Sequence, residues 1–209
     1  QKFYIGLSQK KLSNKQLFRM FSRKFLILKF PRLFHSLIVK SIQNNNYLFR
    51  NISTSSYSHY DAFNNTNINL IFNSDEFYRG QKLLNKMSIK KGDWFVCFHT
   101  RDSQYLKKNG RELYGNKINW NYHNYRDSSI ITFLKAAEFV VSKGGYAIRM
   151  GRNVAEPLPK GLNPMIVDYA TNYWSDFGDI FLSSQCSFFI GSNAGLSVIP
   201  YIFHRPIIL

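Results

Sequence analysis

The chain has 209 residues, of which 28 are Lys or Arg and 12 are Asp or Glu, so its formal net charge is +16. Hydrophobic residues make up 44% of the chain, and its 19 Phe, 13 Tyr and 3 Trp supply enough apolar surface to exclude intrinsic disorder as the main state. No stretch approaches the roughly 20 apolar residues that span a bilayer. The two cysteines lie in apolar runs, which predicts buried thiols of a reducing compartment.

The positive charge is concentrated at the start of the chain. Residues 1–50 carry 11 basic residues and no acidic one, and they are also rich in Phe, Leu and Ile. This pattern predicts a mainly helical N-terminal region with one of two roles. It suits a helix on an anionic membrane surface, and it equally suits a helical domain with a basic solvated face. Nucleic acid would attract the same charge, but no recognition motif accompanies it.

Polar segments divide the chain into three parts. Residues 44–68 are rich in Asn and Ser, as is typical of a loop or a domain connection. We therefore expect an N-terminal region at 1–67, a strand and a helix at 68–90, and a further domain at 91–209. The helix is predicted to begin after Ser74 as N-cap and to end near Met87. The last residues resemble a strand that has just begun, which predicts a fragment truncated at its C-terminus.

From residue 91 onward, strand and helix patterns alternate. The predicted strands cover 94–98, 146–150, 165–167 and 188–190, with another beginning at 207, and the predicted helices cover about 128–142, 176–184 and 195–201. Four such alternations predict an α/β domain with a Rossmann-like, mostly parallel sheet.

Candidate ligand-binding residues follow these strands, because ligands of open parallel sheets bind beyond the carboxyl ends of the strands. They are His99, Thr100, Arg101 and Asp102 after the first strand, Arg149, Gly151 and Arg152 after the second, Asp168 after the third, and residues 191–195 after the fourth. Arginines, small polar residues and a glycine-flanked helix start suit an anion, most naturally a diphosphate. Each element alone also has a purely structural interpretation. His99 with Asp102 lacks a third ligand at the spacing of a metal site.

Several short motifs in a fixed order carry a resemblance to a known family. They are VCFHTRDS at 96–103, YRD at 125–127, AIRMG at 147–151, PLP at 157–159, VDYA at 167–170, SDFGDIFL at 175–182 and FFIGSNAGL at 188–196. Their order over about residues 68–209 resembles a family of bacterial glycosyltransferases linked with cell-surface polysaccharide synthesis. That family is in turn similar to the fucosyltransferase-related branch of the GT-B enzymes, whose C-terminal Rossmann-like domain holds most of the nucleotide-sugar donor.

The resemblance implies a domain organisation and a reaction. Residues 91–209 would be the donor domain, and residues 1–67 would be part of an acceptor-side domain. The protein would transfer a sugar from a GDP- or UDP-sugar to a cell-envelope, surface-glycan or lipid-linked acceptor by an inverting reaction. The sequence lacks an Asp-x-Asp motif, so we expect a metal-independent reaction without a cofactor. The expected location is cytoplasmic, with residues 1–50 against the anionic inner membrane surface.

The resemblance also implies roles for individual residues. Arg101 would bind the donor diphosphate with His99 beside it, and Ser192 and Asn193 would hold phosphate oxygens within the turn from Gly191 to Gly195. Asp179 would face the nucleotide or orient Arg101. Arg149 would be a second cation near Gly151, or a guanidinium fixed by Asp168. Asp102 and His99 are the candidate general bases.

The alternative hypothesis is a non-enzymatic, basic α/β module that binds nucleic acid or another polyanion. Such a module should carry Lys, Arg and aromatic residues across one face. Residues 91–209 instead place their arginines singly at strand ends.

Overall fold

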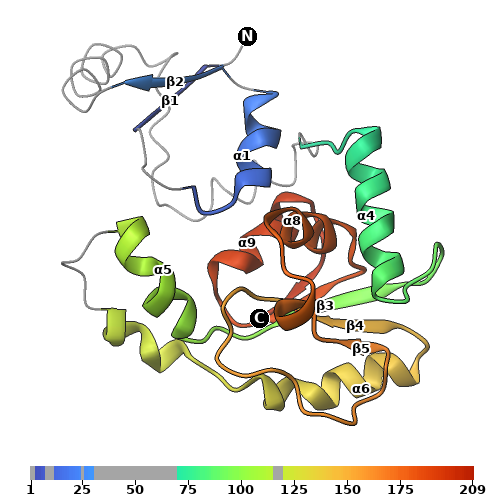
Figure 1. Ribbon diagram of the computed structural model, residues 1–209. Coiled ribbons are helices and arrows are strands. Elements are labelled where there is room, and N and C mark those ends of the chain that lie inside the picture. Colours follow the sequence, from blue (N-terminus) through green and yellow to red (C-terminus); the bar gives the residue numbers. More distant parts are fainter. Residues whose placement is uncertain (1–2, 8–11, 25, 31–69, 115–119) are drawn as a thin grey trace. The chain divides into compact units, whose positions relative to one another are not determined.

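The computed structural model describes residues 3–7, 12–24, 26–30, 70–114 and 120–209 (Figure 1). The chain divides into two compact units. One holds residues 1–10 and 19–71, and the other holds residues 11–18 and 72–209. Within the described ranges, no helix has both the length and the apolar character needed to cross a bilayer.

The N-terminal region contains strands as well as a helix. β1 (Phe3–Leu7) and β2 (Leu26–Phe30) pair in parallel, with Phe3 opposite Leu26, and α1 (Lys15–Ser22) lies between them in the sequence. The prediction of a mainly helical region is therefore wrong for the described part of it. Periodicity alone cannot distinguish a short apolar run in a strand from one in a helix. The rest of the predicted membrane-surface segment, residues 31–50, lies outside the described residues.

The second unit is built on a five-stranded, all-parallel sheet with the order β5-β4-β3-β6-β7. Its strands are β3 (Phe95–His99), β4 (Tyr146–Arg149), β5 (Ile166–Val167), β6 (Phe189–Gly191) and β7 (Ile207–Ile208). The chain moves outward from β3 through β4 to β5, then returns to the other side of β3 as β6. The predicted Rossmann-like α/β fold is confirmed, and this strand order creates a topological switch point between β3 and β6.

Helices cover both faces of this sheet. They are α4 (Ser74–Lys86), α5 (Gln104–Tyr114), α6 (Leu134–Ser142), α7 (Tyr169–Asn172), α8 (Asp176–Gln185) and α9 (Val198–Ile202), together with the 3-10 helices η1 (Trp120–Arg126), η2 (Ile130–Phe133) and η3 (Gly195–Ser197). Figure 1 shows α6 on one side of the sheet and α8 and α9 on the other. The carboxyl edge of the sheet is therefore lined by the loops that connect strands to helices.

Each face has its own core. On the α6 side, Val96 and Phe98 of β3 pack with Ala137 and Val140 of α6. On the other side, the ring of Phe72 meets those of Phe177, Phe181 and Phe203 at centroid distances of 5.5–6.4 Å. Both cysteines, Cys97 and Cys186, are buried and free, as the sequence predicts. The apolar runs that were predicted to be strands are thus buried on both faces of the sheet.

The start of α4 differs from the prediction. Its N-cap is Asn73, whose side chain accepts a hydrogen bond from the Glu76 N–H at 2.8 Å, while the Glu76 carboxylate accepts one from the Asn73 N–H at 2.9 Å. This reciprocal capping box displaces Ser74 from the cap. The described part of the predicted strand, residues 70–72, is irregular. Ser175 caps α8 as predicted, by accepting from the Gly178 N–H at 3.0 Å.

Gly80 gives a test of the packing between α4 and α8. A Cβ at this position would overlap the ring of Phe181, which is fully buried and cannot move aside. Glycine to alanine normally stabilises a helix interior by up to about 1 kcal/mol. We predict that Gly80→Ala instead lowers the free energy of unfolding by about 1–3 kcal/mol because of overpacking. Urea denaturation measures the change. Asn85→Ala, at an exposed position of the same helix, is the control, and a stabilised Gly80→Ala protein would contradict the packing.

Candidate functional site

The carboxyl ends of β3 and β6 are joined directly at the switch point. The Arg101 N–H donates to the Ser192 hydroxyl oxygen at 2.7 Å, and the Ser192 N–H donates to the His99 carbonyl at 3.1 Å. A Cβ at residue 191 would lie only 2.6 Å from that carbonyl oxygen. Glycine at 191 therefore permits the strands to meet closely enough for Ser192 to reach Arg101.

Two guanidinium groups lie at this junction. Arg101 is buried, and its Nη1 donates to the Asp127 carboxylate and, at 2.9 Å, to the His123 carbonyl. The neighbouring Arg126 donates from Nη2 to the Asn193 carbonyl at 2.6 Å. Segment 123–127 is thus hydrogen-bonded to Arg101, which follows β3, and to Asn193, which follows β6. Arg126 and Asp127 belong to the YRD motif, but the sequence assigns them no role, because nothing in their spacing shows that they fold back onto two strand ends.

The turn after β6 is partly exposed to solvent. Asn193 and Gly195 are exposed, and the space around Gly195 is open, since a Cβ there would meet no atom within 4 Å. The predicted helix begins as the short 3-10 helix η3 before α9. An anion that approaches this turn would meet Asn193, Gly195 and the half-buried Arg126 first, because Arg101 is buried.

His99 is held in one tautomer. Its Nδ1 lies 3.1 Å from the Met150 carbonyl. Because a carbonyl can only accept, Nδ1 carries the proton and Nε2 keeps its lone pair. Burial lowers the pKa of His99 below its usual 6.5, so the ring is neutral at pH 7. Nε2 is thus the ring nitrogen of His99 that could accept a proton.

Asp102 has a different role from the one expected of a base. One carboxylate oxygen accepts from the Gln104 N–H at 2.9 Å, and the other accepts from the Ala155 N–H at 3.1 Å. The side chain therefore joins the start of α5 to the loop after β4. Since both oxygens are bonded to main-chain donors, the geometry favours a positioning role for Asp102 and leaves His99 as the better candidate base.

Arg149 and Asp168 form a buried pair. The Arg149 Nη1 lies 3.2 and 3.4 Å from the two Asp168 carboxylate oxygens. Asp168 also accepts from the Leu158 N–H at 2.9 Å and from the Thr171 N–H at 3.3 Å, and thereby caps α7. Of the two roles expected for Arg149, the structure shows the guanidinium fixed by Asp168.

Asp179 does not orient Arg101, whose carboxylate partner is Asp127. The two Asp179 oxygens instead accept from the Tyr169 hydroxyl at 3.2 Å and from the Trp174 Nε1–H at 3.0 Å. Burial raises the pKa of Asp179 to about 7, and these two hydrogen bonds oppose the rise only in part. The expected contact with Arg101 is absent because Asp179, in the first turn of α8, is turned toward the residues that follow β5, and the alternative role of facing the nucleotide stays a prediction.

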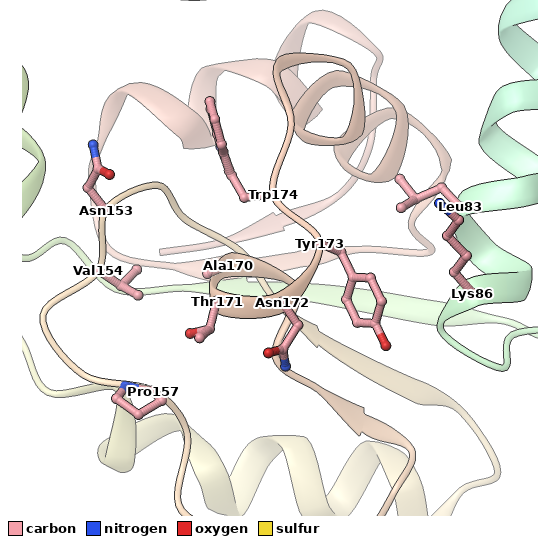
Figure 2. A pocket seen from close by; sticks show the side chains of 10 residues that line it. All are labelled: Leu83, Lys86, Asn153, Val154, Pro157, Ala170, Thr171, Asn172, Tyr173 and Trp174. Atoms are coloured by element: carbon pink, nitrogen blue, oxygen red, sulfur yellow. The ribbon is translucent and has the colours of Figure 1, made fainter.

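A cavity of about 640 Å³ lies at the carboxyl edge beside β4 and β5. Figure 2 shows Leu83 and Lys86 of α4 on one side of it, Asn153, Val154 and Pro157 of the loop after β4 on the other, and residues 170–174 between them. None of the described residues that line it was proposed as a ligand contact from the sequence. Its lining is mostly uncharged, and such residues form no recognisable motif.

Comparisons with known proteins give no relative on which to rest a function. No family model, curated protein or solved structure matches the chain. Within the described ranges, no group of three or more His, Cys, Asp or Glu side chains is arranged to hold a metal ion.

The raised pKa of Asp179 predicts a pH dependence of stability. With a pKa of about 7 when folded and about 4 when unfolded, the folded state binds more protons between these values. The contribution of Asp179 to stability should therefore fall as the pH rises from 4 to 7, by up to about 1.4 kcal/mol per pH unit, and level off above 7.

The isosteric variant Asp179→Asn isolates this contribution, because the other titrating groups cancel in the difference from wild type. Urea denaturation at pH 5, 6 and 7 should show the variant gaining stability relative to wild type as the pH rises. A constant difference across this range would mean that Asp179 is already ionised in the folded protein.

Proposed function

We propose that the chain is a nucleotide-sugar-dependent glycosyltransferase whose donor diphosphate binds at the switch point between β3 and β6. The supporting observation is the convergence of Arg101, Arg126 and the exposed turn at 192–195 at the point where ligands of open α/β sheets bind. The order of sequence motifs over residues 68–209 independently favours the same activity. The acceptor would be a cell-envelope or surface glycan, as that resemblance implies.

The arginines suit the charge that develops in this reaction. Transfer from a nucleotide-sugar expels a nucleoside diphosphate, so negative charge grows on the leaving oxygen in the transition state. A planar guanidinium can donate two parallel hydrogen bonds to such a group. Asp127 holds Arg101 by Nη1, which fixes the plane of the guanidinium before the donor arrives. The backbone N–H groups of the exposed residues Asn193 and Gly195 would add donors that cost no side-chain entropy.

The acceptor hydroxyl requires a base in an inverting reaction. In the proposed step, the hydroxyl oxygen bonds to the anomeric carbon, the bond from that carbon to the diphosphate oxygen breaks, and the hydroxyl proton passes to Nε2 of His99. The Met150 carbonyl holds the proton on Nδ1, so Nε2 is the basic atom. Because the pKa of His99 is lowered, this nitrogen is unprotonated at neutral pH.

A thermal-shift screen of the full chain against UDP, GDP, CMP and dTDP, with and without EDTA, tests the proposal. We expect one nucleoside diphosphate to raise the melting temperature selectively, and EDTA to leave that rise unchanged. Stabilisation by polyanions such as heparin, abolished by salt and without a response to any nucleotide, would support the basic binding module instead.

Arg101→Lys is the sharpest variant for this site. Lysine keeps the positive charge beside Asp127 but loses the planar fork that also reaches the His123 carbonyl, so we predict about tenfold weaker nucleotide binding together with a lower melting temperature of the free protein. Arg79→Lys makes the same exchange on α4, where the guanidinium lies over the Phe177 ring, and should bind the nucleotide like wild type. Equal nucleotide affinities of wild type, Arg101→Lys and Arg79→Lys would show that Arg101 does not bind the nucleotide.

A further inference from the structure

The cavity beside β4 and β5 is a second site, separate in its lining residues from the switch point. We propose that it binds a sugar unit that carries a carboxylate or a phosphate group. The inference rests on the chemistry of the cavity itself and does not require the proposed transferase activity. Its volume of about 640 Å³ falls within the usual range for small-molecule sites, about 300–1,000 Å³.

The polar side chains of the cavity suit hydroxyl groups. Asn153, Thr171 and Asn172 each carry a neutral group that can both donate and accept hydrogen bonds. A sugar hydroxyl also does both, so it can pair with any of the three in either direction. Thr171 and Asn172 are exposed, which suits a hydroxyl-rich ligand that stays partly hydrated when bound.

Apolar groups alternate with these polar ones around the cavity. Leu83, Val154 and Pro157 contribute aliphatic surface from the two opposite sides, and the half-buried ring of Tyr173 lies between Thr171–Asn172 and α4 (Figure 2). A pyranose ring has the matching character, since its C–H faces are apolar and its edge carries the hydroxyls. A purely apolar ligand would displace water from the amides and hydroxyls of the cavity without replacing its hydrogen bonds.

The positive charge of the cavity lining favours an anionic ligand. Lys86 contributes an ammonium group, and no acidic residue is among the described residues that line the cavity. Lys86 is exposed and lies in the last turn of α4. Its ammonium can therefore meet a carboxylate or phosphate that projects from the open side of the cavity.

The walls are held in place by hydrogen bonds to three aspartate carboxylates, two of these bonds exposed and one partly buried. Asp102 accepts from the Ala155 N–H in the loop on one side, and Asp168 accepts from the Thr171 N–H in the floor. Asp179 accepts from the Trp174 indole N–H at the far end. Preorganised walls reduce the entropy lost on binding.

Isothermal titration calorimetry of the full chain with glucuronate, glucose 6-phosphate and glucose tests the site. We expect one or both of the charged sugars to bind and uncharged glucose to bind more weakly. Comparison of the two charged probes shows whether the cavity prefers a carboxylate or a phosphate. Absence of heat with all three probes, or equal binding of all three, would overturn the proposal.

Matched variants on α4 then locate the binding. Lys86→Gln should weaken the binding of the charged sugar about fivefold. Lys82→Gln makes the same charge change on the same helix, where the ammonium lies over the Tyr78 ring, and should bind like wild type. Equal affinities of Lys86→Gln and wild type would place the ligand elsewhere.

Nucleotide binding distinguishes this inference from the proposed function. The thermal shift given by a nucleoside diphosphate should be the same in Lys86→Gln and wild type. Loss of that shift in Lys86→Gln would mean that the cavity holds part of the nucleotide, and the inference of a separate sugar site would fail. Loss of nucleotide binding in Arg101→Lys with sugar binding retained would leave both proposals intact.

Discussion

The close approach of β3 and β6 is the constraint on which the rest of this unit depends. The two strands are distant in the sequence, yet the His99 carbonyl, the Arg101 N–H and both polar groups of Ser192 meet at their ends. Only a residue without a side chain fits at 191, because any Cβ would press on the His99 carbonyl. This junction fixes the starting points of two loops and therefore the position of every group that a ligand would meet there.

Aspartate carboxylates form hydrogen bonds that fix those loops. Their negative charges are therefore engaged within the protein, which determines the charged groups that a ligand can contact. Asp102 and Asp168 accept main-chain N–H groups, Asp179 accepts from Trp174 and Tyr169, and Asp127 holds Arg101. Hydrogen bonds to an ionised carboxylate are stronger than those between neutral groups. The edge of the sheet is therefore held by its acids and offers to a ligand chiefly arginine, lysine, amide and hydroxyl groups. Such a surface suits anions and sugars, which is the chemistry of both proposed sites.

Much of the sheet could be predicted from the sequence because its strands are short, continuous apolar runs bounded by glycine and polar residues. The strands at 95–99, 146–149, 166–167 and 189–191 all lie within one or two residues of their predicted positions. α5 was not predicted, since Asn109 and Gly110 interrupt its pattern with poor helix formers. In the N-terminal region, Leu26–Phe30 was taken as helical because an apolar run of that length has no distinctive period.

The candidate site was predictable at the level of the sheet edge but not at the level of individual contacts. Parallel topology brings His99, Arg101 and Ser192 together, so their clustering follows from the order of strands. Which acid pairs with which arginine depends on how the loops fold back. Orienting Arg101, one of the two roles expected of Asp179, is instead performed by Asp127, which the folding of η1 brings to Arg101 and which received no role from the sequence. The cavity beside β4 and β5 was missed because its Asn, Thr and Tyr side chains are common in ordinary loops.

The most direct test of the account is an NMR titration of the isotope-labelled full chain with the nucleoside diphosphate that stabilises it. If the diphosphate binds at the switch point, the largest backbone amide shifts will occur at Thr100, Arg101 and residues 192–195, and residues 153–157 and 171–174 will change less. Shifts centred on the cavity residues, with the amides of 192–195 unmoved, would contradict the assignment of the diphosphate to the junction of β3 and β6.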